Sequence, residues 1–125
     1  MISFDEFKKV EVTVGKILSA EKVPDTDKLL RLSVDFGKKS ALTPAPEGQP
    51  AVEERDIRQI ISGISAYFPD PQTLVGKKCM FVTNLEPRVI KGLESNGMLF
   101  AVSTEDGKFS LLEPNADIPE GTRAK

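Results

Sequence analysis

Basic side chains at five positions of this 125-residue sequence could neutralise phosphate groups of a nucleic acid. They are Lys16, Lys28, Arg31, Arg88 and Lys91. The first three come from the first two predicted strands, and the last two lie three positions apart beyond Pro87. If all five converge, each phosphate contact would contribute about −0.9 on a duplex, or about −0.7 on a single strand, to the slope of log affinity against log salt. Any one of them alone is more typical of a solvated surface.

Asn84 and Ser95 are neutral candidates in the same part of the chain. Their side chains suit phosphate oxygens or ribose 2′-hydroxyls. Each also has a structural interpretation, because Asn84 could cap a turn and Ser95 could be a buried hydroxyl that ties two strands together. The sequence leaves both interpretations open.

The composition excludes several kinds of catalysis. The chain has no histidine, no tryptophan and one cysteine, which removes His-based acid–base chemistry, Ser–His and Cys–His nucleophiles and imidazole zinc sites. The sequence shows no Gly-rich phosphate loop and no metal-ligand cluster, so we expect a non-catalytic protein without cofactor or metal. Cys79 stands among apolar residues and is predicted to be buried.

The charge balance requires any nucleic-acid site to be local. The chain has 17 basic and 19 acidic residues, a net charge of −2. Only residues 77–101, with four basic and two acidic groups, are net positive. The apolar runs are too short to cross a membrane, and the first residues lack the features of a secretion signal. Together with the single cysteine, this predicts a cytoplasmic protein.

Hydrophobic periodicity predicts one mostly β domain over residues 1–125. Ser3 and Glu6 have the spacing of a capping box and predict a short helix that ends near Lys9. A strand with a bulge at Gly15 should follow. The other strands and strand pieces are expected at residues 30–36, 57–62, 79–83, 89–90 and 98–102.

Turn signals separate these strands. Asp70 and Pro71 predict a helical turn between the third and fourth strands, and Asp106-Gly107 predicts a hairpin. Residues 38–55, which contain three prolines and few large apolar residues, are expected to form a surface loop insertion.

This pattern favours an all-β fold, a five-stranded Greek-key OB barrel with short helices and a C-terminal extension. An SH3-like barrel or a small sandwich fits nearly as well. A late apolar set would either pad the barrel or form a dimer contact. It consists of Phe109, Leu111, Leu112 and Ile118.

Residues 84–98 read Asn-Leu-Glu-Pro-Arg-Val-Ile-Lys-Gly-Leu-Glu-Ser-Asn-Gly-Met. This run resembles the signature of the tRNA-binding OB domain found at the C-terminus of methionyl-tRNA synthetases, in stand-alone tRNA-binding proteins and in EMAP-II-like cytokine precursors. The resemblance covers residues 3–125. Further segments match in order, namely Val14-Gly15-Lys16-Ile17, Asp27-Lys28-Leu29-Leu30, Ser62-Gly63-Ile64 and Val75-Gly76-Lys77.

The resemblance implies an OB barrel that binds tRNA by shape and backbone, with little base selectivity. Such a domain would serve methionyl-tRNA synthetase as its C-terminal domain or as a subunit, and would raise its effective affinity for tRNA by tethering. Many members of the family are homodimers. A chaperone branch of the same fold binds peptides, which makes a dimeric peptide-binding chaperone the alternative function.

Aromatic residues and surface chemistry would separate the two functions. The chain has seven Phe and one Tyr, and Tyr67 and Phe68 are the candidates for stacking on bases. Few exposed aromatic side chains would agree with recognition of a folded RNA shape. Clustered cations on the barrel would favour RNA, whereas an exposed apolar groove would favour peptides.

Overall fold

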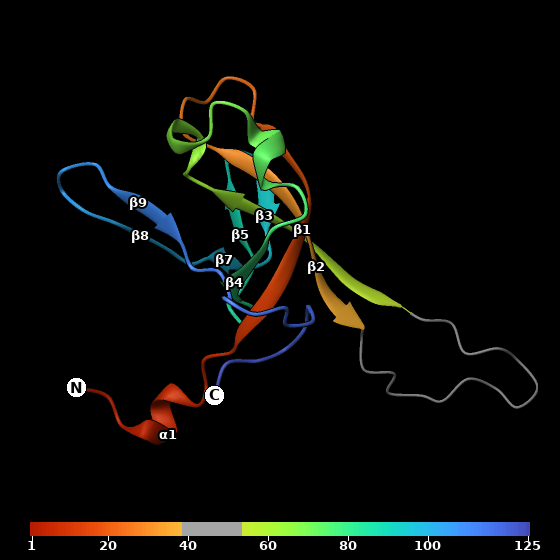
Figure 1. Cartoon of the computed structure of the whole chain (residues 1–125), viewed down its shortest axis with the longest axis vertical. Helices are drawn as coiled ribbons and strands as arrows, with labels where there is room; N and C mark the ends of the chain where they lie inside the picture. The colour runs from red at the N-terminus through yellow and green to blue at the C-terminus, as the bar shows by residue number, and fades with distance from the viewer. Residues whose placement is uncertain (39–53) are drawn as a thin grey trace, which may run out of the picture.

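The computed structural model describes residues 1–38 and 54–125, which form a curled antiparallel sheet (Figure 1). The sheet has the order β3-β2-β1-β4-β7, and β7 contacts β3, so the sheet curls toward closure. The strands are β1 (Val12–Lys22), β2 (Leu30–Lys38), β3 (Arg55–Ser62), β4 (Lys78–Val82) and β7 (Met98–Leu99). This arrangement confirms the expected five-stranded OB architecture, with β7 as the fifth strand.

Local capping signals account for the short helices. These are α1 (Phe4–Phe7), η1 (Ser65–Tyr67) and η2 (Pro71–Leu74). The Ser3 hydroxyl accepts a hydrogen bond from the Glu6 backbone N–H at 3.1 Å, and the Asp70 carboxylate accepts one from the Gln72 N–H at 3.1 Å. Both predicted caps are confirmed. No helix among the described residues is long and apolar enough to cross a membrane.

Two β-hairpins lie next to β7 in the sequence, one before it and one after it. One consists of β5 (Arg88–Ile90) and β6 (Leu93–Ser95), and the other of β8 (Ala101–Ser103) and β9 (Phe109–Leu111). The expected strand piece at 98–102 is therefore divided at Phe100 between the barrel and the second hairpin. The turn at Asp106-Gly107 is confirmed, with Gly107 at φ +91°.

Gly15 lies where β1 crosses the barrel interior. A Cβ there would lie 2.6 Å from side-chain atoms of both Phe36 and Val34. The register shift of β1 against β2 falls between Ile17 and Ser19, so the expected bulge at Gly15 is wrong in position. Gly15 instead makes room for the core, whose fully buried side chains include Ile17, Leu30, Leu32, Val34, Ile60 and Phe81.

The C-terminal segment completes the barrel beside β1. The Val14 N–H donates to the Thr122 carbonyl at 2.9 Å, and the Ala124 N–H donates to the Val12 carbonyl at 2.8 Å.

Within the late apolar set, Phe109 and Leu111 pack against the core, which supports their padding role. The expected loop insertion at 38–55 falls mostly on residues 39–53, outside the described residues.

Candidate nucleic-acid interface

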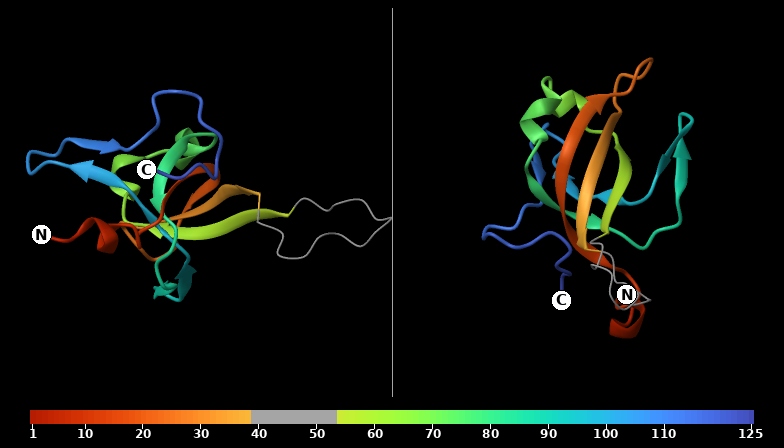
Figure 2. Two further views of the ribbon diagram at one scale, coloured as in Figure 1. Left: turned by 90° about the horizontal axis from the view of Figure 1, so that it is seen from below. Right: turned by 90° about the vertical axis from the view of Figure 1, so that its right-hand side faces the viewer.

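The β1–β2 turn and the tip of the β5–β6 hairpin lie at the same end of the barrel (Figure 2, right). In OB folds the corresponding loops flank the strand face that binds oligonucleotides. Here they line an open hollow of about 370 Å³, which we call the loop cavity. Its lining residues are Asp25, Thr26, Asp27, Lys28, Leu29, Ile90 and Lys91. Two of the five candidate cations, Lys28 and Lys91, therefore share one site.

A two-residue turn positions Lys91 at the tip of its hairpin. Ile90 pairs with Leu93, and Lys91 and Gly92 between them have φ values of 51° and 80°, the signs required by a type I′ turn. Arg88 is exposed at the start of β5, opposite Ser95. Within residues 1–38 and 54–125, neither Lys28 nor Arg88 nor Lys91 forms an ion pair.

The other two candidate cations have different surroundings. Arg31 pairs across the β1–β2 ladder with Glu21, and its Nε donates to Glu21 Oε1 at 2.8 Å. Lys16 is partly buried farther along the same ladder, opposite Asp35. Arg31 is thus compensated by a carboxylate, and Lys16 does not line the loop cavity. Of the five candidate cations, Lys28 and Lys91 are the two that line the loop cavity.

Asn84 and Ser95 both make structural hydrogen bonds. Asn84 Oδ1 accepts from the Glu11 N–H at 2.8 Å, and its Nδ2 donates to the Lys9 carbonyl. Ser95 is 4% exposed; its hydroxyl accepts from the Ile61 N–H at 3.0 Å and donates to the Gly97 carbonyl at 3.1 Å. Ser95 thus ties two strands together as a buried hydroxyl, as expected, whereas Asn84 does not cap a turn of its own and instead fastens the segment between α1 and β1.

Two carboxylates also line the loop cavity. Asp25 and Asp27 lie in the turn between β1 and β2, and Asp25 has φ 62°. Leu29 and Ile90 supply apolar side chains to the same cavity. Sequence reasoning did not select these four residues as site residues, because their common position depends on how the β5–β6 hairpin packs. The only local signal was their nearness in sequence to the two lysines: Asp27 and Leu29 flank Lys28, Ile90 precedes Lys91, and Asp25 is three positions before Lys28.

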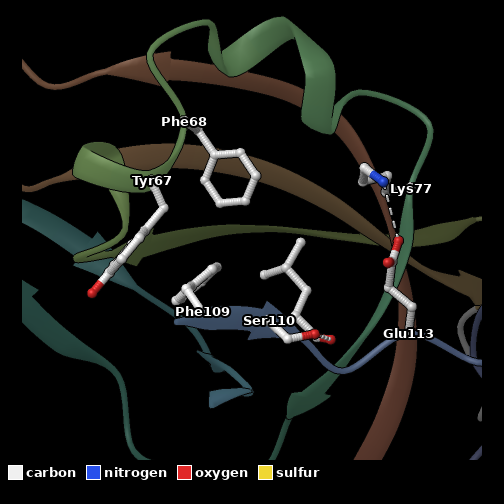
Figure 3. A pocket seen from close by; sticks show the side chains of 7 residues that line it. Tyr67, Phe68, Lys77, Phe109, Ser110 and Glu113 are labelled. Carbon is white, nitrogen blue, oxygen red and sulfur yellow. Dashed lines mark hydrogen bonds and ion pairs between the residues drawn. The ribbon is translucent and has the colours of Figure 1, made fainter. Parts of the chain in front are cut away.

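A second cavity, of about 430 Å³, lies between η1 and β9 (Figure 3). Tyr67 stacks on Phe109 with ring centroids 4.1 Å apart, and Phe68 meets Phe109 edge to face at 5.8 Å. At the rim, Lys77 Nζ lies 3.4 Å from a Glu113 carboxylate oxygen. Phe68 packs against the core, whereas Tyr67 remains 44% exposed but already stacks on Phe109.

Cys79 is fully buried on β4, as predicted. Burial raises the pKa of its thiol to about 12, and the negative charge of Glu113 adds to this effect. The thiol therefore stays protonated near neutral pH and is not a nucleophile. Within the described residues, no group of three His, Cys, Asp or Glu side chains could hold a metal ion.

The curled five-stranded sheet and the cavity between its loops define a small OB-fold domain. The family described as "Putative tRNA binding domain" matches residues 51–123. The chain belongs to this tRNA-binding domain family, which confirms the resemblance found in the sequence.

Known proteins are similar to this chain over nearly its whole length. Methionine–tRNA ligase of Methanospirillum hungatei JF-1 is 44% identical over 99% of this chain, which spans 16% of the ligase. A crystal structure of a MetRS-related protein from Pyrococcus horikoshii is 38% identical, with a TM-score of 0.79 over 100% of this chain and 98% of that one. The chaperone CsaA of Bacillus anthracis str. Ames is 26% identical, with a TM-score of 0.76 over 100% and 99% of the two chains.

Proposed function

We propose that this chain binds tRNA by its shape and backbone, as the C-terminal domain or a subunit of a methionyl-tRNA synthetase in the cytoplasm. The observation that carries the proposal is the meeting of Lys28 and Lys91 at one cavity, with Arg88 on the same hairpin. The similarity to methionine–tRNA ligases and to a MetRS-related protein supports the link to a synthetase.

The number of available cations sets the strength of binding. Lys28 and Lys91 at the loop cavity and Arg88 on the same hairpin can neutralise about three phosphates, so the slope of log affinity against log salt should be about −2 to −3. So few contacts give weak, salt-sensitive binding. A weak module is useful when it is tethered to an enzyme, because the effective concentration of the bound tRNA is then high.

Filter binding tests this function directly. Total tRNA and an unstructured RNA of the same length are compared at two salt concentrations. We expect tRNA to bind more tightly at both concentrations and both RNAs to bind less tightly at high salt. Equal, weak binding of the two RNAs would remove the proposal of shape recognition.

The proposal includes a homodimer. Phe4 and Phe7 of α1 are exposed, Phe4 by 72%, and α1 lies away from the barrel (Figure 1). Covering these side chains with a second copy would remove their apolar surface from water. Sedimentation equilibrium should show a dimer that becomes a monomer in the variant Phe4→Ser with Phe7→Ser. A wild-type monomer at high micromolar concentration would contradict the homodimer.

Peptide binding is the second candidate function. It is favoured by the aromatic cavity around Tyr67, Phe68 and Phe109 (Figure 3) and by the similarity to chaperone CsaA. A labelled unfolded polypeptide distinguishes the two functions by fluorescence anisotropy. If peptides are the ligand, Tyr67→Ala will weaken polypeptide binding and leave tRNA binding unchanged. If wild type binds tRNA but no polypeptide, the second function is excluded.

A further inference from the structure

Two left-handed turn residues line the loop cavity. Among the described residues, Asp25 (φ 62°) and Lys91 (φ 51°) are the two non-glycine residues with positive φ. Both line this cavity, although one comes from the β1–β2 turn and the other from the β5–β6 tip. Left-handed backbone is disfavoured for residues with a Cβ, and such residues collect at ligand-binding sites. The two turns fix the loops that line this cavity, so its lining side chains are held in position before any ligand binds.

The side chains define the chemistry of that ligand. Leu29 and Ile90 offer apolar contact, while Lys28 and Lys91 offer positive charge. Asp25 and Asp27 equal that charge in number and can accept hydrogen bonds. A bare phosphate would gain little from such a balanced site. A ligand with an apolar flat face, an anionic group and N–H or O–H donors matches all three kinds of lining group.

The volume of the loop cavity suits a small organic group. At about 370 Å³, it falls at the lower end of the range of roughly 300–1,000 Å³ that is usual for small-molecule sites. The Thr26 hydroxyl already donates to the Val23 carbonyl at 2.8 Å, so it helps to hold the turn in shape. The two carboxylates therefore remain the principal acceptors of the cavity.

We infer that the loop cavity binds one unpaired nucleotide of the RNA. The base contacts Leu29 and Ile90, and Lys28 and Lys91 neutralise the phosphate of this nucleotide and that of its neighbour in the RNA. Asp25 and Asp27 accept hydrogen bonds from base N–H groups or from the ribose 2′-hydroxyl. This inference rests on the proposed function and adds to it a specific anchor, because an extruded nucleotide fixes where the RNA sits on the barrel.

A titration followed by ¹⁵N–¹H NMR tests the cavity without tRNA. GMP is the probe because its base carries adjacent N–H donors that one carboxylate can accept. We expect GMP to shift the amide signals of residues 25–29 and 90–92 more than the rest of the spectrum. Inorganic phosphate at the same concentration should shift them far less. Equal shifts with phosphate, or no shift with GMP, would overturn the inference.

Two neighbouring residues of β5 provide a matched pair of variants. Ile90 lines the loop cavity, whereas Val89 is 74% exposed and does not line it. Ile90→Asp and Val89→Asp add the same charge to the same hairpin. We expect Ile90→Asp to abolish the GMP shifts and to bind tRNA about tenfold more weakly than Val89→Asp, or about 1.4 kcal/mol, because its carboxylate replaces an apolar contact and repels the phosphate.

The outcomes separate the inference from the proposed function. If tRNA binds wild type but the two variants bind it equally well, the nucleotide site is wrong and the tRNA-binding function stands. If wild type fails to bind tRNA, the proposed function fails, and the GMP titration alone decides whether the cavity takes a nucleotide. If circular dichroism shows that Ile90→Asp is unfolded, Ile90→Ser and Val89→Ser repeat the comparison.

Discussion

Lys28 and Lys91 line one cavity although they come from different loops of the barrel. Lys28 precedes β2, and Lys91 lies at the tip of the β5–β6 hairpin. Their proximity depends on the turn at Lys91-Gly92, which holds Lys91 in a left-handed conformation. The cationic site is therefore a product of hairpin geometry as much as of residue type.

Substitutions of Lys91 test its effect on the turn conformation separately from the effect of its positive charge. Lys91→Asn should stabilise the fold by up to about 1 kcal/mol, since asparagine tolerates left-handed backbone and suits the first position of a type I′ turn. The slope of log tRNA affinity against log salt should become shallower by about 0.7–0.9. Thermal unfolding and filter binding measure the two effects. Lys91→Arg keeps the charge and should keep the slope; an unchanged slope in Lys91→Asn would exclude a phosphate contact.

Ser95→Ala tests the structural interpretation of Ser95. The Ile61 N–H would lose its acceptor in a buried position, which costs about 1–3 kcal/mol of unfolding free energy. Ser103→Ala, on an exposed position of β8, is the control and should change stability little. Urea denaturation measures both variants. If Ser95→Ala leaves stability intact but weakens tRNA binding, the hydroxyl is a ligand group instead.

Glycine substitutions test the tight packing of β1. Gly15→Ala places a methyl group 2.6 Å from side-chain atoms of Phe36 and Val34, and overpacking of this kind costs about 1–3 kcal/mol. Gly63→Ala meets nothing within 4 Å and should be close to neutral. Urea midpoints compare the two variants. Equal midpoints would show that the barrel interior adapts to the extra methyl.

The buried thiol of Cys79 should be unreactive in the folded protein. Because burial raises its pKa from 9.0 to about 12, the thiolate fraction at pH 8 falls about 1,000-fold, tenfold for each pKa unit. Ellman's reagent should react at once in urea and very slowly without it. Rapid reaction of the native protein would contradict the burial.

The same pKa shift makes stability depend on alkaline pH. The unfolded chain releases the Cys79 proton at a lower pH than the folded chain, so this contribution to stability is complete below about pH 9 and is lost between pH 9 and 12. Urea midpoints across this range should fall more steeply in wild type than in Cys79→Ala. Parallel curves would show that Cys79 does not contribute.

The sequence predicted those parts of the structure that depend on neighbouring residues. The alternation in β2 and the caps at Ser3 and Asp70 are local signals, and each is confirmed. The role of Gly15 was missed because it depends on contact with Phe36 from another strand. β6 was missed because three residues carry little periodicity, and only the Lys91-Gly92 turn reveals it.

The candidate site was only partly predicted, because it too depends on contacts between segments that are far apart in the sequence. Lys28 and Lys91 were selected, but the hydrogen bonds of Asn84 and Ser95 reach partners far along the chain. The Arg31–Glu21 pair was open to prediction, because the two residues lie at equal distances from the centre of the β1–β2 turn and so face each other in a hairpin.

The most direct test of the central claim compares two triple variants in tRNA binding. Lys28→Ala with Arg88→Ala and Lys91→Ala removes the two cations that line the loop cavity and the one at the start of the same hairpin. Lys108→Ala with Arg123→Ala and Lys125→Ala removes the same residue types and charge elsewhere. We predict that the first variant loses most tRNA affinity and most of the salt slope while its melting temperature stays near that of wild type, and that the second binds nearly as wild type does. Equal tRNA affinities of the two variants would contradict the account.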